Sequence, residues 1–250
     1  MTSQCTLNAG QQNRRAFLRA AGTIAATALL PFAALSQTGT SARMKIGTVG
    51  SGRVGSAIGG AWIKAGHEVM FSSLDLEADK KLAASLGAGA YAGTPREAAA
   101  FGSVLLVAVP YTALPGLGRE LGDLIKGKII IDTSNPIVAR DGDMAVAARE
   151  KGAGIASAEF LPGARIVRAF NAIGAARMAE ARNKSERVGM PFAGDDPDAI
   201  SVASALIRDV GYEPVRVGTL AAMGKYLVPG TPLAGERSPE EIRKVAATLK

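Results

Sequence analysis

The 250-residue sequence has little cysteine, little histidine and few aromatic residues, and each shortage excludes a class of function. Cys5 is the one cysteine and His67 the one histidine, so neither an intramolecular disulfide nor a cysteine cluster or multi-histidine metal site can form. Aromatic residues make up 5% of the chain, which leaves little surface to stack against bases. We therefore expect no metal centre and no nucleic-acid partner.

The excess of positive charge is also small once the first 36 residues are set aside. They contain Arg14, Arg15 and Arg19 but no acid, and residues 20–35 are uncharged. This pattern is typical of a twin-arginine export signal cleaved after residue 36, because the uncharged stretch is about four residues shorter than a bilayer-spanning helix. Without the three arginines, the 29 basic residues fall to 26 against 22 acidic ones. The resulting net charge of +4 is too small to suggest a polyanionic partner.

The predicted signal leads to an expectation about location. We expect a periplasmic or secreted protein, in preference to one held by an uncleaved membrane anchor. Resemblance to a twin-arginine signal implies a route that carries folded proteins, so a cofactor bound in the cytoplasm would leave with the chain and should bind tightly. Residues 37–43 are a polar linker before the folded part.

Residues 44–218 alternate between short apolar runs and amphipathic segments. The runs at residues 103–109 and 128–132 lack polar alternation, which is typical of strands buried on both faces of a parallel sheet. Further strands are predicted at 44–49, 67–71, 165–170, 190–193 and 214–217, with helices at 53–64, 75–86, from 95 onward, and at 197–210. This order predicts an α/β fold of the Rossmann type, a doubly wound, mostly parallel sheet with helices on both faces.

The C-terminal residues 219–250 depart from that alternation and contain Pro229, Pro232 and Pro239. We expect this extension to pack either on the domain itself or on a partner subunit. In the second case the chain would be a homodimer.

The first predicted strand leads into Gly50-Ser51-Gly52-Arg53-Val54-Gly55, a G-x-G-x-x-G motif that opens the following helix. Between a strand and a helix, this motif is typical of dinucleotide binding. The first glycine makes the turn, the second lets the pyrophosphate approach the backbone, and the third lets the helix contact the strand. The amides at the helix start would bind the phosphates. We therefore expect Gly50, Ser51, Gly52, Arg53, Val54 and Gly55 to bind the cofactor.

The end of the second strand favours NADP over NAD. An NAD site usually has an acid there to hold the ribose hydroxyls, whereas this chain has Ser72 and Ser73, which leave room for a 2′-phosphate and can donate to it. Arg53 is a candidate cation beside that phosphate. NAD stays the alternative because Leu74 is uncharged and Asp75 follows it.

Ligands of open α/β sheets bind at the carboxyl ends of the strands, and those ends supply the remaining candidates. We expect Ala108 and Val109 to contact the cofactor. The residues expected to position the nicotinamide and the substrate are Pro110, Tyr111, Asn135, Pro136 and Asn171. The asparagines have an alternative role as helix caps, while Asp132 and His67 are expected to be structural.

Together these segments resemble the coenzyme F420-dependent NADP oxidoreductase family, whose fold also forms the reductase domain of metalloreductases of the six-transmembrane kind. The likeness covers nearly all of residues 44–234. It rests on the Gly50 loop, residues 66–69 with Ser72 and Ser73, and residues 108–111, 131–136, 161–164, 169–171, 193–196 and 229–232. The chain departs from the family at Leu74, where arginine is frequent.

The resemblance implies direct hydride transfer between the nicotinamide and a flavin-like ring, such as F420 or a flavin, without an acid–base residue. We therefore expect an NADP-dependent oxidoreductase acting on a small redox acceptor. The alternative is a non-catalytic dinucleotide-binding or sensor subunit that serves a membrane redox partner.

Overall fold

The computed structural model describes residues 42–181 and 187–249. The predicted export signal and residues 37–41 of the linker lie outside the described residues. Within the described ranges, no helix combines the length and the apolar character needed to cross a bilayer.

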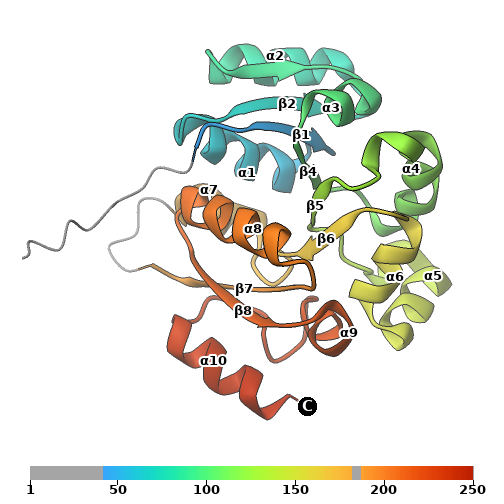
Figure 1. Ribbon diagram of the computed structural model, residues 1–250, viewed down its shortest axis with the longest axis vertical. Coiled ribbons are helices and arrows are strands. Elements are labelled where there is room, and N and C mark those ends of the chain that lie inside the picture. Colours follow the sequence, from blue (N-terminus) through green and yellow to red (C-terminus); the bar gives the residue numbers. More distant parts are fainter. Residues whose placement is uncertain (1–41, 182–186, 250) are drawn as a thin grey trace, which may run out of the picture. The chain divides into compact units, whose positions relative to one another are not determined.

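The described residues form an eight-stranded sheet (Figure 1). Its strands are β1 (Lys45–Val49), β2 (Glu68–Ser72), β3 (Ala90–Ala92), β4 (Val104–Val107), β5 (Ile129–Asp132), β6 (Arg165–Arg168), β7 (Gly189–Gly194) and β8 (Glu213–Gly218). They lie in the order β3-β2-β1-β4-β5-β6-β7-β8, and each neighbouring pair is parallel except β6 and β7. The strand order reverses between β1 and β4, a switch point at which such sheets bind ligands. The predicted doubly wound, mostly parallel sheet is confirmed.

Helices cover both faces of this sheet. They are α1 (Arg53–Lys64), α2 (Leu76–Leu86), α3 (Pro95–Phe101), α4 (Leu114–Leu121), α5 (Val138–Lys151), α6 (Ala153–Phe160), α7 (Ala175–Glu180), α8 (Pro197–Val210), α9 (Leu220–Met223) and α10 (Pro239–Thr248). Figure 1 shows α1, α7 and α8 on one side and α4, α5 and α6 on the other.

Side chains of the central strands alternate between two hydrophobic cores. In β4, Leu106 packs in the core that contains Trp62 of α1, while Leu105 packs in the core that contains Leu114 of α4. All four residues are fully buried. A strand with an apolar core on each face has no polar positions, which explains the unbroken apolar runs in the sequence.

Two strands end earlier than the sequence predicts. The run at 103–109 stops being a strand at Val107, and the run at 165–170 stops at Arg168. Phe170 then takes a φ of 65°, which is rare for a residue other than glycine. In both places the chain leaves the sheet to form the edge on which ligands of this fold bind. The short strand β3 was not predicted, because Ala90–Ala92 is only three residues long.

The C-terminal extension packs on its own domain. α10 lies against β7 and β8, and Ile242 of α10 is fully buried. The amide of Gly189 in β7 donates to the main-chain oxygen of Arg237 at 2.9 Å, which ties the segment before α10 to the sheet. Packing on a partner subunit stays a prediction.

Candidate dinucleotide-binding site

The three glycines of the loop between β1 and α1 are required for different reasons. Gly50 has a φ of 94°, and a Cβ there would lie 2.4 Å from the main-chain oxygen of Ala108. A Cβ on Gly55 would lie 2.0 Å from the main-chain oxygen of Gly50. At Gly52, by contrast, a Cβ would meet no atom within 4 Å. The first and third glycines thus allow close packing, whereas the second leaves room for a ligand.

Main-chain bonds fix this loop against β2. The amides of Gly50 and Ser51 donate to the main-chain oxygen of Ser72 at 2.8 and 3.1 Å. α1 then begins after Gly52 without a side-chain cap and without an acid in its first turn. Its first amides, at the positive end of the helix dipole, are therefore available to an anion such as a pyrophosphate.

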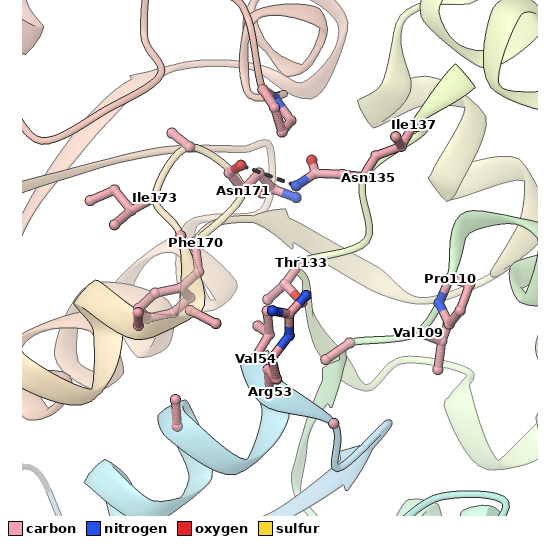
Figure 2. A pocket seen from close by; sticks show the side chains of 18 of the residues that line it. Arg53, Val54, Val109, Pro110, Thr133, Asn135, Ile137, Phe170, Asn171 and Ile173 are labelled. Carbon is pink, nitrogen blue, oxygen red and sulfur yellow. Dashed lines mark hydrogen bonds between the residues drawn. The ribbon is translucent and has the colours of Figure 1, made fainter. Parts of the chain in front are cut away.

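Two cavities meet at the loop. The large cavity, of about 1100 Å³, lies beside the loops that follow β5 and β6 (Figure 2). The small cavity, of about 680 Å³, extends past the end of β2 toward α3 and α4. Gly52, Ala108, Val109 and Pro110 line both, so the cavities adjoin. This arrangement suits a dinucleotide with its pyrophosphate at Gly52 and one nucleoside on each side.

Asn135 and Asn171 lie together at the large cavity, as the strand ends predict (Figure 2). The Asn135 Nδ2 donates to the main-chain oxygen of Asn171 at 3.1 Å, and its Oδ1 accepts from Arg168 at 3.2 Å. The Asn171 Nδ2 donates to the main-chain oxygen of Ser134 at 3.4 Å, and its Oδ1 is buried without a hydrogen-bond partner. Both amides are thus held by the protein, and Asn171 retains one unsatisfied acceptor.

Sequence reasoning missed Arg168, which lies beneath these amides. Its side chain and that of Asp132 are fully buried and form an ion pair at 2.6 Å. Arg168 also donates to the main-chain oxygen of Leu227 at 3.1 Å, so it joins β5, β6 and the C-terminal segment. The sequence signal that could have found Arg168 is an arginine within a predicted buried strand. Asp132 also accepts from the amide of Ser134 at 2.8 Å, in keeping with its expected structural role.

Five of the expected site residues line neither cavity: Ser51, Gly55, Ser72, Tyr111 and Pro136. Tyr111 is fully buried, its hydroxyl contacts Ala153 and Ser157 of α6, and burial raises the pKa of its phenol. The Ser72 hydroxyl donates to the main-chain oxygen of Thr48 at 2.9 Å. Pro136 is buried and lines neither cavity. Because β4 ends at Val107, the chain turns Tyr111 into the core instead of presenting it at the strand end.

Arg53 and the residues that follow β2 line different cavities. Ser73, Leu74 and Asp75 line the small cavity. Arg53 lines the large one, and in Figure 2 its guanidinium points toward Thr133.

Asp79 of α2 is a second residue that sequence reasoning missed. It is 1% exposed and accepts hydrogen bonds from the hydroxyl of Ser51 and from that of Ser73, the latter at 2.8 Å. The signal that could have found it is helical spacing, because Asp79 stands four residues before Ala83, the other buried residue of α2.

His67 lines neither cavity. It is buried, its Nδ1 accepts from the amide of Met44 at 3.2 Å, and its Nε2 lies 3.0 Å from a carboxylate oxygen of Asp209. These contacts support the expected structural role.

Over most of its length, the chain is similar to known proteins. The family model described as NADP oxidoreductase coenzyme F420-dependent matches residues 45–136. Over 193 residues the chain is 30% identical to an F420-dependent NADP reductase from Methanothermobacter thermautotrophicus. The aligned part covers 71% of this chain and 82% of that protein. The chain is 29% identical over 182 residues to the metalloreductase STEAP3 of Rattus norvegicus, again 71% of this chain but 34% of that longer protein.

A solved structure of a hypothetical protein from Sinorhizobium meliloti has the same fold, with a TM-score of 0.68 and 26% sequence identity. The match covers 79% of this chain and 96% of that one. The sequence relatives and this structural match agree with the resemblance inferred from the motifs. The chain therefore belongs to the F420-dependent NADP oxidoreductase family.

Proposed function

We propose that this chain is an NAD(P)-dependent oxidoreductase that transfers a hydride directly between the nicotinamide ring and a flat, flavin-like acceptor. The lining of the large cavity carries the proposal. Among the described residues that line it, no aspartate, glutamate, histidine, lysine, tyrosine or cysteine occurs. Hydride transfer between two stacked rings needs positioning and exclusion of water, and it needs no proton shuttle.

The residues around the loop fit a dinucleotide. The open space at Gly52 and the uncapped start of α1 would hold the pyrophosphate, and the small cavity would hold the adenosine. The large cavity, at about 1100 Å³, exceeds the roughly 300–1,000 Å³ of most single-ligand pockets, so it has room for two rings. When bound, the nicotinamide supplies or accepts the hydride.

The lining of the large cavity would orient these rings. Val109, Pro110 and Ile173 offer apolar walls. The amide of Asn135 is held by Arg168, and a donor bound in the cavity would satisfy the unpaired oxygen of Asn171. Arg53 adds a positive charge, which suits an acceptor with a phosphate or carboxylate tail. F420 and flavin nucleotides have such tails, and the Methanothermobacter relative is named for F420.

The test is direct transfer of a labelled hydride. The purified full chain is mixed with NADH or NADPH carrying deuterium at both hydrogens of nicotinamide C4, together with the deazaflavin F420, which accepts the hydride at a carbon that does not exchange with water. FMN, whose acceptor nitrogen exchanges its hydrogen with water, is tested for turnover only. We expect oxidation of the nucleotide, and we expect the deuterium to reach the acceptor ring without dilution by solvent protons. Deuterium lost entirely to water would contradict direct transfer, whereas nucleotide binding without turnover of any acceptor would favour the sensor-subunit alternative.

A Gly52→Val variant gives the matched control. Its side chain would enter the empty space at residue 52, so the fold should persist while nucleotide binding is lost. Unchanged binding in this variant would show that the pyrophosphate does not lie at the loop.

A further inference from the structure

The small cavity is lined by acids but by no cation. Its described lining includes Asp75 and Glu120 and contains neither lysine nor arginine. Ser73 lies in the same lining, at the end of β2, where the adenosine ribose of a dinucleotide binds in this fold. The charge of this end of the site is therefore negative.

The hydroxyl protons of the loop and of the strand end are already committed. Ser51 and Ser73 both donate to the carboxylate of Asp79, which is buried beneath them. The Ser73 oxygen also accepts from the amide of Asp75 at 3.1 Å. A serine that gives its one proton to a carboxylate can only accept from a ligand. Ser73, which lines the small cavity, thus presents a lone pair to the nucleotide.

None of the nearby cations among the described residues lines the small cavity. Arg53 faces the large cavity, and Arg96 at the start of α3 donates to the main-chain oxygen of Glu120. Lys80 of α2 pairs with Glu77 at 2.8 Å. Leu74, whose side chain is fully exposed, offers no charge.

We propose that this end of the site selects an unphosphorylated ribose, so that the chain prefers NAD(H) to NADP(H). Ribose hydroxyls can donate to the Ser73 oxygen, whereas a 2′-phosphate has mainly acceptor oxygens and would place about −1.5 to −2 charges beside a carboxylate. The sequence favoured NADP because Ser72 and Ser73 could donate. In the structure Ser72 donates to the main-chain oxygen of Thr48 and Ser73 to Asp79, which removes that reason. The inference rests on the proposed function and sets this chain apart from the relative named for NADP.

Binding of the two reduced nucleotides to the purified full chain tests the inference, measured by nicotinamide fluorescence without an acceptor. We expect NADH to bind at least about tenfold more tightly than NADPH, equivalent to about 1.4 kcal/mol. If neither nucleotide binds, the proposed function itself fails. If both bind and NADPH binds equally well or better, the proposed function stands and the preference for NAD(H) is overturned.

Two variants test the assigned cause. Asp79→Asn should shift the NADH-to-NADPH affinity ratio toward NADPH, because the amide no longer takes both hydroxyl protons. Asp143→Asn, at an exposed acid of α5, removes the same charge as a control and should leave the ratio unchanged. Should the Asp79 variant not fold, Leu74→Arg should make the same shift, and Leu74→Gln should not. A folded Asp79→Asn variant with an unmoved ratio would overturn the role of this cluster, and so would an unmoved ratio in Leu74→Arg where Asp79→Asn does not fold.

Discussion

Arg168 is a buried charge whose contribution to stability depends on its partner, Asp132. Its guanidinium and the Asp132 carboxylate are both inaccessible to solvent, so removing one leaves the other buried and unpaired. We expect Arg168→Met to lower the free energy of unfolding by about 3–5 kcal/mol. The double variant Arg168→Met with Asp132→Leu should recover part of this loss, since no lone charge stays in the core.

Denaturant unfolding measures both effects. Arg165→Met, at the other end of β6, is the control: its side chain is 37% exposed and its ion pairs are of the surface kind, so the change should stay within about 1 kcal/mol. A double variant less stable than Arg168→Met alone would contradict the argument. The Asn135 amide would lose its donor in every Arg168 variant, so nucleotide affinity should fall even where stability recovers.

Asp141 should make stability depend on pH. Burial acts to raise its pKa, but hydrogen bonds from Arg140 and from the amide of Ile137 outweigh it and hold the pKa below its usual value. A carboxyl with a lowered folded-state pKa stabilises the protein fully above its unfolded pKa of about 3.9, and this contribution disappears as the pH falls through the folded-state pKa.

Asp141→Asn should therefore lower the free energy of unfolding by about 1.5–3 kcal/mol at about pH 7, and by less in acid. Unfolding of both proteins across the acid range gives the comparison. Asp143→Asn, at an exposed position of the same helix, should stay within about 0.5 kcal/mol throughout. A loss of stability in Asp141→Asn that is the same at every pH would mean that the charge of Asp141 does not stabilise the start of α5.

At the scale of elements, α1 packs closely on the loop at one glycine and has room for a side chain at another. A Cβ at residue 55 would meet the main-chain oxygen of Gly50, whereas at residue 60 the nearest atom would be the end of Leu86, at 3.5 Å. Gly55→Ala should destabilise the protein by about 1–3 kcal/mol and weaken nucleotide binding, because α1 must move away from the loop. Gly60→Ala should be neutral or stabilising by up to about 1 kcal/mol.

Thermal unfolding and nucleotide titration of the two alanine variants provide the measurement. They add the same atom to the same helix, so the difference between them isolates the contact with Gly50. Equal behaviour would show that the loop adjusts without loss.

The elements could be predicted where a local pattern specifies them. β4 is apolar throughout and β5 is apolar up to Asp132, and the glycine loop has a fixed spacing, so all three were found in the sequence. The antiparallel pairing of β6 and β7 has no local signal, because strand direction depends on how the intervening chain packs. Asn135 and Asn171 follow strands and were predicted, whereas Asp79 and Arg168 became site residues only through contacts with distant segments.

At the scale of the whole molecule, the N-terminal residues bear on the compartment in which the folded domain acts. We propose that residues 1–36 direct twin-arginine export, which moves the domain with its nucleotide already bound. The proposal rests on Arg14, Arg15 and the uncharged stretch after them, which lie outside the described residues.

Replacing both Arg14 and Arg15 by lysine keeps the charge but removes the arginine pair that the route reads. We expect the wild-type chain in the periplasmic fraction with nucleotide bound, and the variant in the cytoplasm with equal nucleotide content. Arg19→Lys is the matched control and should not change the location. Export of the double-lysine variant would argue against the route, and a periplasmic protein without nucleotide would mean that the cofactor is bound weakly enough to be lost on the way.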